Sequence, residues 1–414
     1  MSPRRYRLAV LGASLLVAAL ACLRSGPPAP LPADAPADRF SAARAHAVLA
    51  DLLGDGAPHP VGSAANARFR ARLLEHLRAL GLQPEEQRAF TCTERGSCAE
   101  VTNILAWLPG QVPGPALALV AHYDSVPAGP GAADDGHGVA VVLEVLRALR
   151  DSPRHAPLVA IFTDGEEAGL LGARALGRHP RLGELGIALN VEARGTTGAG
   201  RMFETSDGNA ALIAAYAAAP RPSAHSLSYE VYRRLPNDTD FTILKRHGLQ
   251  GMNFAFIGGV QRYHTPRDDL AHLDLGSVQQ HGDAVLAAAR ALLAADLPAP
   301  SAHNAHYADL LGLVLLRWPA WLDLPLAGLV VLALLASALR RRRELSVRRV
   351  LLALAAPVLA VAAALAGAGL LLWAIAALTG PLGPWPAASG RCLLALAAAA
   401  SAAALAALRP LARR

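Results

Sequence analysis

The sequence predicts an α/β protein, with a mostly parallel sheet covered by helices on both faces and about four transmembrane helices. Two observations support this class. Apolar strands alternate with helical segments through the middle of the chain, which is the pattern of a parallel sheet buried on both faces. Long runs without charge lie toward the two ends, and each is close to the roughly 20 residues that cross a bilayer.

The apolar runs separate the ends of the chain from its middle. One follows the basic start MSPRRYR, and three lie near the C-terminus; they cover 8–23, 324–339, 350–378 and 392–408. We interpret the first as an uncleaved signal anchor, with a cleaved signal peptide as the alternative. The run at 350–378 is long enough to tilt in the membrane, and the alanine-rich last run is the least hydrophobic.

Arginine predicts which side of the membrane each segment occupies. Basic segments occur at 1–7, 340–349 and 409–414, and an excess of arginine beside a span is typical of cytoplasmic segments. Four spans put all three segments on that side and the middle of the chain on the periplasmic or exoplasmic side. We therefore expect an integral protein of a bacterial inner membrane. The net charge of +7 comes from the two ends, so it gives no support to nucleic-acid binding.

The composition divides the chain into six parts. We expect a signal anchor (1–24), a Pro/Ala-rich linker (25–44), a globular domain (45–298), a second linker (299–323), three transmembrane helices (324–408) and a cytoplasmic tail (409–414). Cys92 and Cys98 bracket a short loop in a domain with no other cysteine. On the oxidising side of a membrane this spacing predicts a disulfide, with two unpaired thiols as the alternative.

Within the globular domain, helical spacing behind the N-cap residue Ser63 predicts a helix over 63–80. In chain order, we expect strands at 81–92, 101–110, 115–124, 156–167, 186–195 and 248–259, with further helices at 134–150, from 168 onward and at 277–295. The last four strands are the apolar ones. In such sheets ligands bind at the carboxyl ends of the strands.

Histidines and carboxylates gather at those strand ends. They are His122, Asp134, Glu166, Glu167, Glu192 and His264. The loop 121–138 has no Lys or Arg, so its carboxylates need another cation. Imidazoles and carboxylates without cysteine suit zinc, with manganese or cobalt as alternatives. Two histidines and three carboxylates exceed one tetrahedral site, and they suit two Zn²⁺ ions about 3.5–4 Å apart with one bridging carboxylate.

Two further features refine this metal site. The adjacent Glu166 and Glu167 suit a division of roles in which one binds metal and the other handles protons. Asp124 lies two residues beyond His122, where it could accept the second N–H of that ring and fix its orientation. Neighbouring Asp135 is either a helix cap or an orienting group. Asp240 could likewise cap a helix or orient a loop, and Arg194 could meet a substrate carboxylate or pair with Glu192.

Several segments in a fixed order resemble the co-catalytic zinc aminopeptidases, a family that also holds glutamate carboxypeptidase and the endoplasmic-reticulum metallopeptidases. The matching segments are PHPVGSAANARF, HYDS…PGAADD, TDGEEAGLLG, NVEARG, NDTDF and YHTPRDDL. The resemblance covers roughly residues 40–297 and is closest to the membrane-anchored branch. It implies a zinc-exopeptidase fold and a peptide substrate.

The resemblance also implies roles for the site residues. One metal would be held by His122, Asp134 and Glu192, and the other by Asp134, Glu167 and His264, with Asp134 bridging. Soluble aminopeptidases of this kind usually have Asp where Glu192 stands, whereas membrane-anchored relatives often have Glu. This departure leaves strict aminopeptidase specificity open.

Two more residues match catalytic positions of the family. Glu166 matches the general base that activates water. Tyr263, directly before the last histidine, resembles a tyrosine that steadies the tetrahedral oxyanion in some members. Asp124 keeps its expected orienting role beside them.

We therefore expect a membrane-anchored di-zinc exopeptidase, an aminopeptidase in the first instance, that hydrolyses short peptides outside the cytoplasm. The alternative is a glutaminyl cyclase-like acyltransferase with one zinc, although its members typically have Trp at the position of Tyr263. A third reading is a non-catalytic receptor or scaffold, whose known examples have lost the ligands that this chain retains. The sequence predicts no oligomeric state.

Overall fold

The structure is a computed structural model that describes residues 26–340, 347–379 and 400. The chain divides into two compact units, 1–320 and 321–414. The predicted signal anchor (1–24), the last apolar run (392–408) and the tail (409–414) lie outside the described residues. The first unit holds every predicted site residue.

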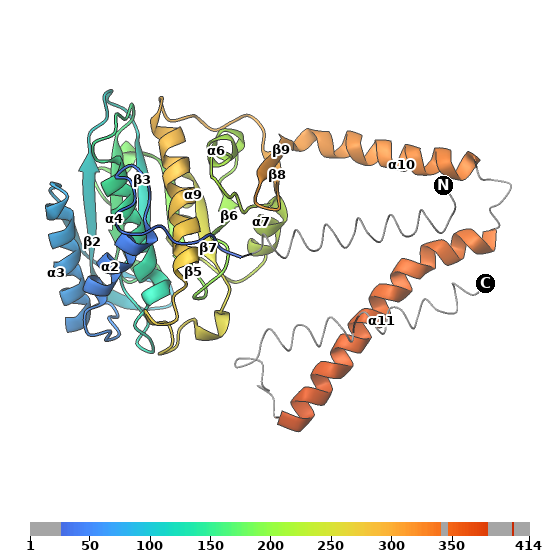
Figure 1. The fold of residues 1–414 in the computed structure, drawn as a ribbon, viewed down its shortest axis with the longest axis horizontal. Helices are drawn as coiled ribbons and strands as arrows, with labels where there is room; N and C mark the ends of the chain where they lie inside the picture. The colour runs from blue at the N-terminus through green and yellow to red at the C-terminus, as the bar shows by residue number, and fades with distance from the viewer. Residues whose placement is uncertain (1–25, 341–346, 380–399, 401–414) are drawn as a thin grey trace. The chain divides into compact units, whose positions relative to one another are not determined.

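The first unit is built on a seven-stranded sheet with the order β1-β2-β4-β3-β5-β7-β6 (Figure 1). The strands are β1 (Glu85–Cys92), β2 (Cys98–Leu108), β3 (Ala116–His122), β4 (Leu158–Thr163), β5 (Leu185–Ala193), β6 (Arg201–Thr205) and β7 (Gln250–Phe256). The four central strands run parallel, while β1, β2 and β6 pair antiparallel.

The prediction of a mostly parallel sheet is therefore correct only for its centre. A turn of a few residues joins β1 to β2, and such a short connection allows only an antiparallel pair. Cys92 and Cys98 face each other across that turn and form the predicted disulfide. β6 was not predicted, because its five residues carry too short a pattern to separate from a loop.

Helices cover both faces of the sheet. They are α2 (Ala42–Leu53), α3 (Ala64–Ala79), α4 (His137–Leu149), α5 (Leu171–Leu176), α6 (Ala210–Tyr216), α7 (Ser226–Tyr232), α8 (Asp240–Arg246) and α9 (Leu275–Leu293). The short turns are η1 (Ala132–Gly136), η2 (Leu182–Glu184) and η3 (Val260–Arg262). The predicted helices at 63–80, 134–150 and 277–295 are confirmed in α3, α4 and α9.

Strand β3 shows why the central strands are apolar throughout. Leu117 and Leu119 point into the core formed with α2, α3, α4 and α9. Ala118 and Val120 point into a second core, to which Leu176 of α5 and Leu244 of α8 belong. Both faces are thus dry, as continuous apolar runs predict. The carboxyl ends of these strands then open onto one edge of the sheet.

The segments predicted as linkers have structure of their own. In 25–44, the backbone N–H of Leu31 donates to Gln279 Oε1 at 2.9 Å, and α2 begins at Ala42 behind the N-cap Ser41. In 299–323, β8 (Ala305–Leu310) and β9 (Val314–Pro319) form an antiparallel hairpin. The short turn η4 (Ala320–Leu322) follows the hairpin. The folded region therefore extends beyond 45–298 on both sides.

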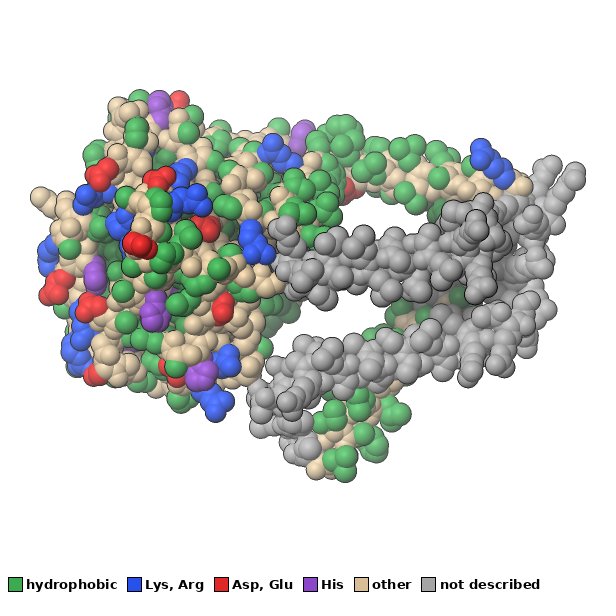
Figure 2. All heavy atoms as spheres, viewed as in Figure 1, with side chains coloured by type: hydrophobic (Ala, Val, Ile, Leu, Met, Phe, Trp, Pro, Cys, Tyr) green, Lys and Arg blue, Asp and Glu red, His purple; other side chains and the backbone are tan. Residues whose placement is uncertain are grey.

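In the second unit the described residues form the helices α10 (Asp323–Arg340) and α11 (Val347–Thr379). Hydrophobic side chains line the visible surface of α10 (Figure 2). By length and composition, the windows Ala320–Ser337 and Val358–Leu378 could each cross a membrane. They coincide with two of the four predicted spans. Among the described residues there are two such helices.

Candidate metal centre

The parallel strands bring the predicted site residues to one edge of the sheet. His122 is the last residue of β3, and Glu192 lies one residue before the end of β5. Glu166 and Glu167 follow β4, and His264 follows β7 after η3. Because the carboxyl ends of parallel strands share an edge, segments far apart in sequence meet there.

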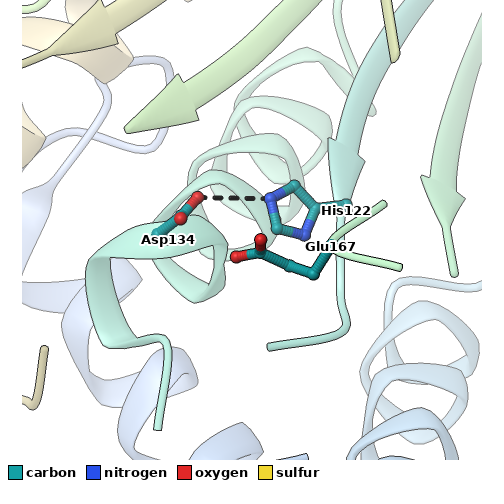
Figure 3. Close-up of side chains that lie close together, drawn as sticks. All are labelled: His122, Asp134 and Glu167. Carbon is teal, nitrogen blue, oxygen red and sulfur yellow. Dashed lines mark hydrogen bonds and ion pairs between the residues drawn. The ribbon is translucent and has the colours of Figure 1, made fainter. Parts of the chain in front are cut away.

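Asp134 lies between the two histidines. Its Oδ1 is 3.3 Å from His122 Nε2, and its Oδ2 is 3.1 Å from His264 Nε2. Figure 3 shows the carboxylate of Asp134 aimed at the ring of His122, with Glu167 alongside. Each oxygen therefore faces a different imidazole, which is the arrangement of a bridging carboxylate.

Each histidine also has a second carboxylate next to it. Glu192 Oε2 lies 3.8 Å from His122 Nε2, and Glu167 Oε1 lies 3.0 Å from His264 Nε2. Two ligand sets that share Asp134 result. This grouping matches the one that the family resemblance implies.

Asp135 also lies close to His122 and Glu192, within 4.8 Å by ligand atoms. Its Oδ2 accepts the backbone N–H of His122 at 3.3 Å. Its carboxylate also occupies the space in which a Cβ on Gly138 would stand. Asp135 therefore holds the end of β3 against the first turn of α4, whereas Asp134 faces both histidines.

The site holds several buried carboxylates, whose negative charges need cations nearby to be stable. Burial raises the pKa of Glu166 and of Glu192 well above the ordinary value, and it raises the pKa of Glu167 to about 7. Neighbouring carboxylates add to each shift. Apart from its 3.0 Å contact with His264 Nε2, Glu167 Oε1 has no hydrogen-bond donor within the described part of the chain. Buried carboxylates this close together stay charged only beside positive charge, and oxygen and imidazole donors fit zinc.

The protonation of His122 is fixed by its neighbour. Its Nδ1 lies 3.1 Å from the backbone carbonyl oxygen of Asp124 and 3.4 Å from Oδ1 of the same residue. The Nδ1–H therefore has two acceptors on Asp124, the backbone carbonyl and the carboxylate, and Nε2 faces the site. The carboxylate lies within reach of the ring, as the predicted orienting role requires, and the carbonyl is an acceptor that the sequence did not suggest.

The carboxylate of Asp124 has a different role. Its Oδ1 accepts the backbone N–H of Glu166 at 2.9 Å, and its Oδ2 accepts that of Glu167 at 3.2 Å. Asp124 is 1% exposed, so both bonds are shielded from water. It therefore fixes the backbone of Glu166 and Glu167 relative to the end of β3.

Sequence reasoning missed Asp268, which holds the loop around Asp134. Its Oδ1 accepts the backbone N–H of Ala133 at 2.7 Å, and its Oδ2 accepts that of Asp134 at 3.1 Å. The only sequence signal was its place in YHTPRDDL, four residues after His264. Asp268 thus connects the bridging ligand to the segment that carries the last histidine.

Asp240 also supports the site from outside it. The hydroxyl of Thr163, the last residue of β4, donates to the carboxylate of Asp240. The N-cap of α8 is Thr239. Of the two roles predicted for Asp240, the structure therefore supports orientation of the strand end over helix capping.

Tyr263 lies directly over His264. The two rings stack with centroids 3.7 Å apart, and His264 itself has a positive φ of 56°. Burial and the nearby carboxylates raise the pKa of Tyr263, which keeps its hydroxyl protonated as a donor. The guanidinium of Arg194 lies 5.5 Å from the centre of the Tyr263 ring.

Fold and site together define an α/β metalloenzyme whose centre lies at the carboxyl edge of a parallel sheet. Residues 103–289 match the family model of peptidase family M28. The matched stretch includes every side chain of the site described above.

Curated relatives include membrane proteases. The endoplasmic reticulum metallopeptidase 1 of Rattus norvegicus is 34% identical over 247 residues, covering 56% of this chain and 27% of the relative. The vacuolar membrane protease of Candida albicans is 31% identical over 221 residues, covering 52% and 26%. The matched region thus spans about a quarter of each relative.

Solved structures share the fold at lower identity. BSAP, a zinc aminopeptidase from Bacillus subtilis, gives a TM-score of 0.51 at 17% identity, covering 63% of this chain and 98% of its own. A glutaminyl cyclase from Porphyromonas gingivalis gives 0.50 at 23% identity, covering 60% and 98%. At these identities the likeness concerns the fold alone.

Proposed function

We propose that this protein is a membrane-anchored di-zinc exopeptidase, an aminopeptidase in the first instance, acting on short peptides outside the cytoplasm. The observation that carries the proposal is the position of Asp134, whose two oxygens face two different histidines. Each histidine has its own further carboxylate, Glu192 or Glu167. A site for a single ion has no need of this duplicated arrangement.

The roles of the residues follow from their positions. When bound, zinc would polarise the scissile carbonyl and lower the pKa of water toward about 7. Glu166 accepts the proton of the attacking water and passes it to the leaving amine. Asp124 holds the backbone of Glu166 in place, and the hydroxyl of Tyr263 donates to the developing oxyanion.

Metal content and substrate choice test this proposal together. The purified full chain should hold two zinc ions and hydrolyse a dipeptide with a free amino group much faster than its N-acetylated form. One zinc ion with cyclisation of N-terminal glutamine would favour the glutaminyl cyclase alternative. Two bound zinc ions without any peptide hydrolysis would contradict the exopeptidase.

The proposed location has a separate test. The support comes from the arginine-rich segments and from the two apolar helices among the described residues. Alkaline phosphatase fused after residue 300 should be active in a bacterial host, because it would reach the periplasm. The same fusion after residue 345 should be inactive, and activity there would contradict the four-span topology.

A further inference from the structure

Exposed apolar side chains gather on two neighbouring elements at the end of the first unit. On α7, Leu227 is 66% and Val231 52% exposed, and they lie four residues apart on one helix face. The hairpin adds four more, each between 45% and 56% exposed. We call these six residues the hairpin patch: Leu227, Val231, Leu310, Leu313, Val314 and Leu316.

The hairpin has one buried and one open face. Tyr307 and Leu315 are 2% and 5% exposed and belong to the main core. Leu310 pairs with Val314 across the hairpin, and side chains alternate along a strand. The open face therefore displays Leu310, Val314 and Leu316, each about half exposed among the described residues. A strand pair in contact with water on that face would normally carry polar residues.

Helix α7 is joined firmly to the hairpin and to the sheet. The backbone N–H of Tyr307 donates to Ser226 Oγ at 2.9 Å, and Tyr232 packs edge-on against Phe203 of β6 with centroids 4.7 Å apart. The patch thus lies beside the β6 edge, whereas β1 forms the opposite edge. Figure 1 shows α7, β8 and β9 together at one end of the first unit.

The chain itself determines what this end of the domain meets. β9 ends at Pro319, and α10 begins at Asp323, while the apolar window starts at Ala320. Even fully extended, the four Cα–Cα steps from Pro319 to Asp323 span at most about 14 Å. The headgroup layer on each side of a bilayer is only about 5–8 Å thick. A membrane-embedded α10 therefore holds the hairpin at the lipid surface.

An aromatic residue marks the same junction. Trp321 is 61% exposed, and tryptophan is enriched where a span leaves the hydrocarbon for the headgroups. The four hairpin residues of the patch and this tryptophan lie within one short segment, from Leu310 to Trp321. Lipid is within reach of all of them, whatever else the protein binds.

We propose that the hairpin patch inserts into the headgroup layer of the bilayer and fixes the first unit with its β6 edge on the lipid and its β1 edge away from it. The inference depends on the membrane anchoring proposed above. It adds a second contact between protein and bilayer, made by the folded unit itself. The catalytic unit then has one orientation on the membrane, set by the patch.

Site-specific fluorescence in vesicles tests the proposal on the full chain. Cys22 and Cys392 are first replaced by Ala, which leaves only the disulfide-bonded pair. Single cysteines are then introduced as Leu227→Cys, Leu313→Cys and, as a control on β1, Arg88→Cys. Arg88 has a side chain that is 67% exposed, and six strand spacings of about 4.8 Å separate the two sheet edges. Each variant is labelled with an environment-sensitive dye and reconstituted into phosphatidylcholine–phosphatidylglycerol vesicles.

Lipids that carry a shallow quencher should reduce the fluorescence at positions 227 and 313 by about half and leave position 88 nearly unchanged. Equal, weak quenching at all three positions in vesicle-bound protein would overturn the inference while anchoring stands. A blue-shifted but unquenched signal at 227 and 313 would overturn it in favour of a partner protein or a second copy. Failure of the unlabelled chain to float with vesicles would instead overturn the proposed anchoring, and the patch contact with it.

Discussion

Asp124 accepts the backbone N–H of Glu166 at 2.9 Å and, through its other oxygen, that of Glu167. One buried carboxylate therefore positions both members of the glutamate pair. Replacement by Asn would place an NH₂ group opposite one of the two amides, so one buried N–H would lose its acceptor. A lost buried hydrogen bond costs about 1–3 kcal/mol.

We expect Asp124→Asn to lower kcat at least tenfold and to weaken zinc binding, since both glutamates shift. KM should change less than kcat. Kinetics and zinc titration of the purified variant measure both effects. The control is Asp55→Asn, because Asp55 has a side chain that is 67% exposed. Wild-type kcat and zinc affinity in Asp124→Asn would contradict the role assigned to this carboxylate.

The glutamate pair should respond differently to the same change. Glu166→Gln removes the general base but no ligand, so both metals stay and kcat falls by ~10²–10⁴, roughly 3–5 kcal/mol of transition-state stabilisation. Glu167→Gln replaces a charged ligand by an amide, so one metal binds more weakly and added zinc partly restores activity. Metal analysis and kinetics on both variants decide between the roles. Loss of a metal equivalent in Glu166→Gln alone would reverse the assignment.

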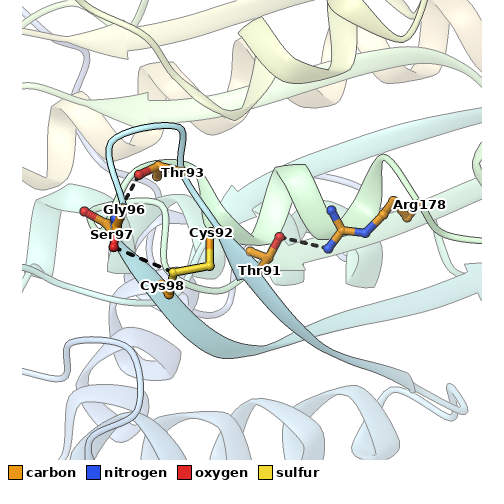
Figure 4. Close-up of a disulfide and its surroundings, with 7 residues drawn as sticks. All are labelled: Thr91, Cys92, Thr93, Gly96, Ser97, Cys98 and Arg178. Carbon is orange, nitrogen blue, oxygen red and sulfur yellow. Dashed lines mark hydrogen bonds between the residues drawn. A yellow bond between two sulfur atoms is a disulfide. The ribbon is translucent and has the colours of Figure 1, made fainter.

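The disulfide should stabilise the β1–β2 turn. Cys92 and Cys98 are six residues apart, and Figure 4 shows their bond closing the turn around Gly96 and Ser97. Closing a loop of this size lowers the conformational entropy of the unfolded chain, which raises the free energy of unfolding by about 2 kcal/mol. The double variant Cys92→Ser, Cys98→Ser should lose about that much free energy of unfolding in denaturant titrations. Unchanged stability would mean that the turn is held without the bond.

A buried histidine should make stability depend on pH. His59 is 3% exposed and stacks on Phe69 with centroids 4.6 Å apart. Burial lowers the pKa of His59 to about 4, so between pH 6.5 and 4 the unfolded chain binds a proton that the folded chain rejects. Stability is therefore full above pH 6.5 and falls as the pH drops through this window.

From pH 7 to pH 5, His59 alone should cost the protein about 2 kcal/mol. The variant His59→Phe keeps the stacked ring and should lose that much less stability over the same interval. Denaturant unfolding of both proteins at the two pH values gives the difference. Protonation of the metal ligands affects both proteins equally and cancels. An identical pH dependence in the two would show that the pKa of His59 is the same in the folded and unfolded states.

The sequence predicted the features that depend on residues close together in the chain, namely the central strands and the polar residues at their ends. Apolar runs identified the four central strands because both faces of those strands are buried. Chemistry at the strand ends identified His122 and Glu192, since parallel strands bring their carboxyl ends to one edge. The same logic identified the glutamate pair after β4. Each of these features depends on residues close together in sequence.

Long-range choices could not be predicted in the same way. Asp268 bonds to Ala133, 135 residues earlier, and no periodicity encodes that pairing. The carboxylate of Asp124 was predicted to face the ring of His122, but its bonds to the backbone of Glu166 and Glu167, more than forty residues later, could not be read from the sequence. The β8–β9 hairpin was hidden by its position between the globular domain and the apolar runs.

The hold of Asp268 on the loop around Asp134 also bears on the order in which the chain assembles. His264 and Asp268 belong to one short segment. His264 faces the carboxylate of Asp134, and Asp268 accepts the backbone N–H of Asp134. The loop around Asp134 therefore lacks these contacts until a segment more than a hundred residues later in the chain has folded against it. Closing so long a loop carries an entropic cost before any contact repays it. A complete site therefore forms only after the segment that follows β7 has docked against the loop around Asp134.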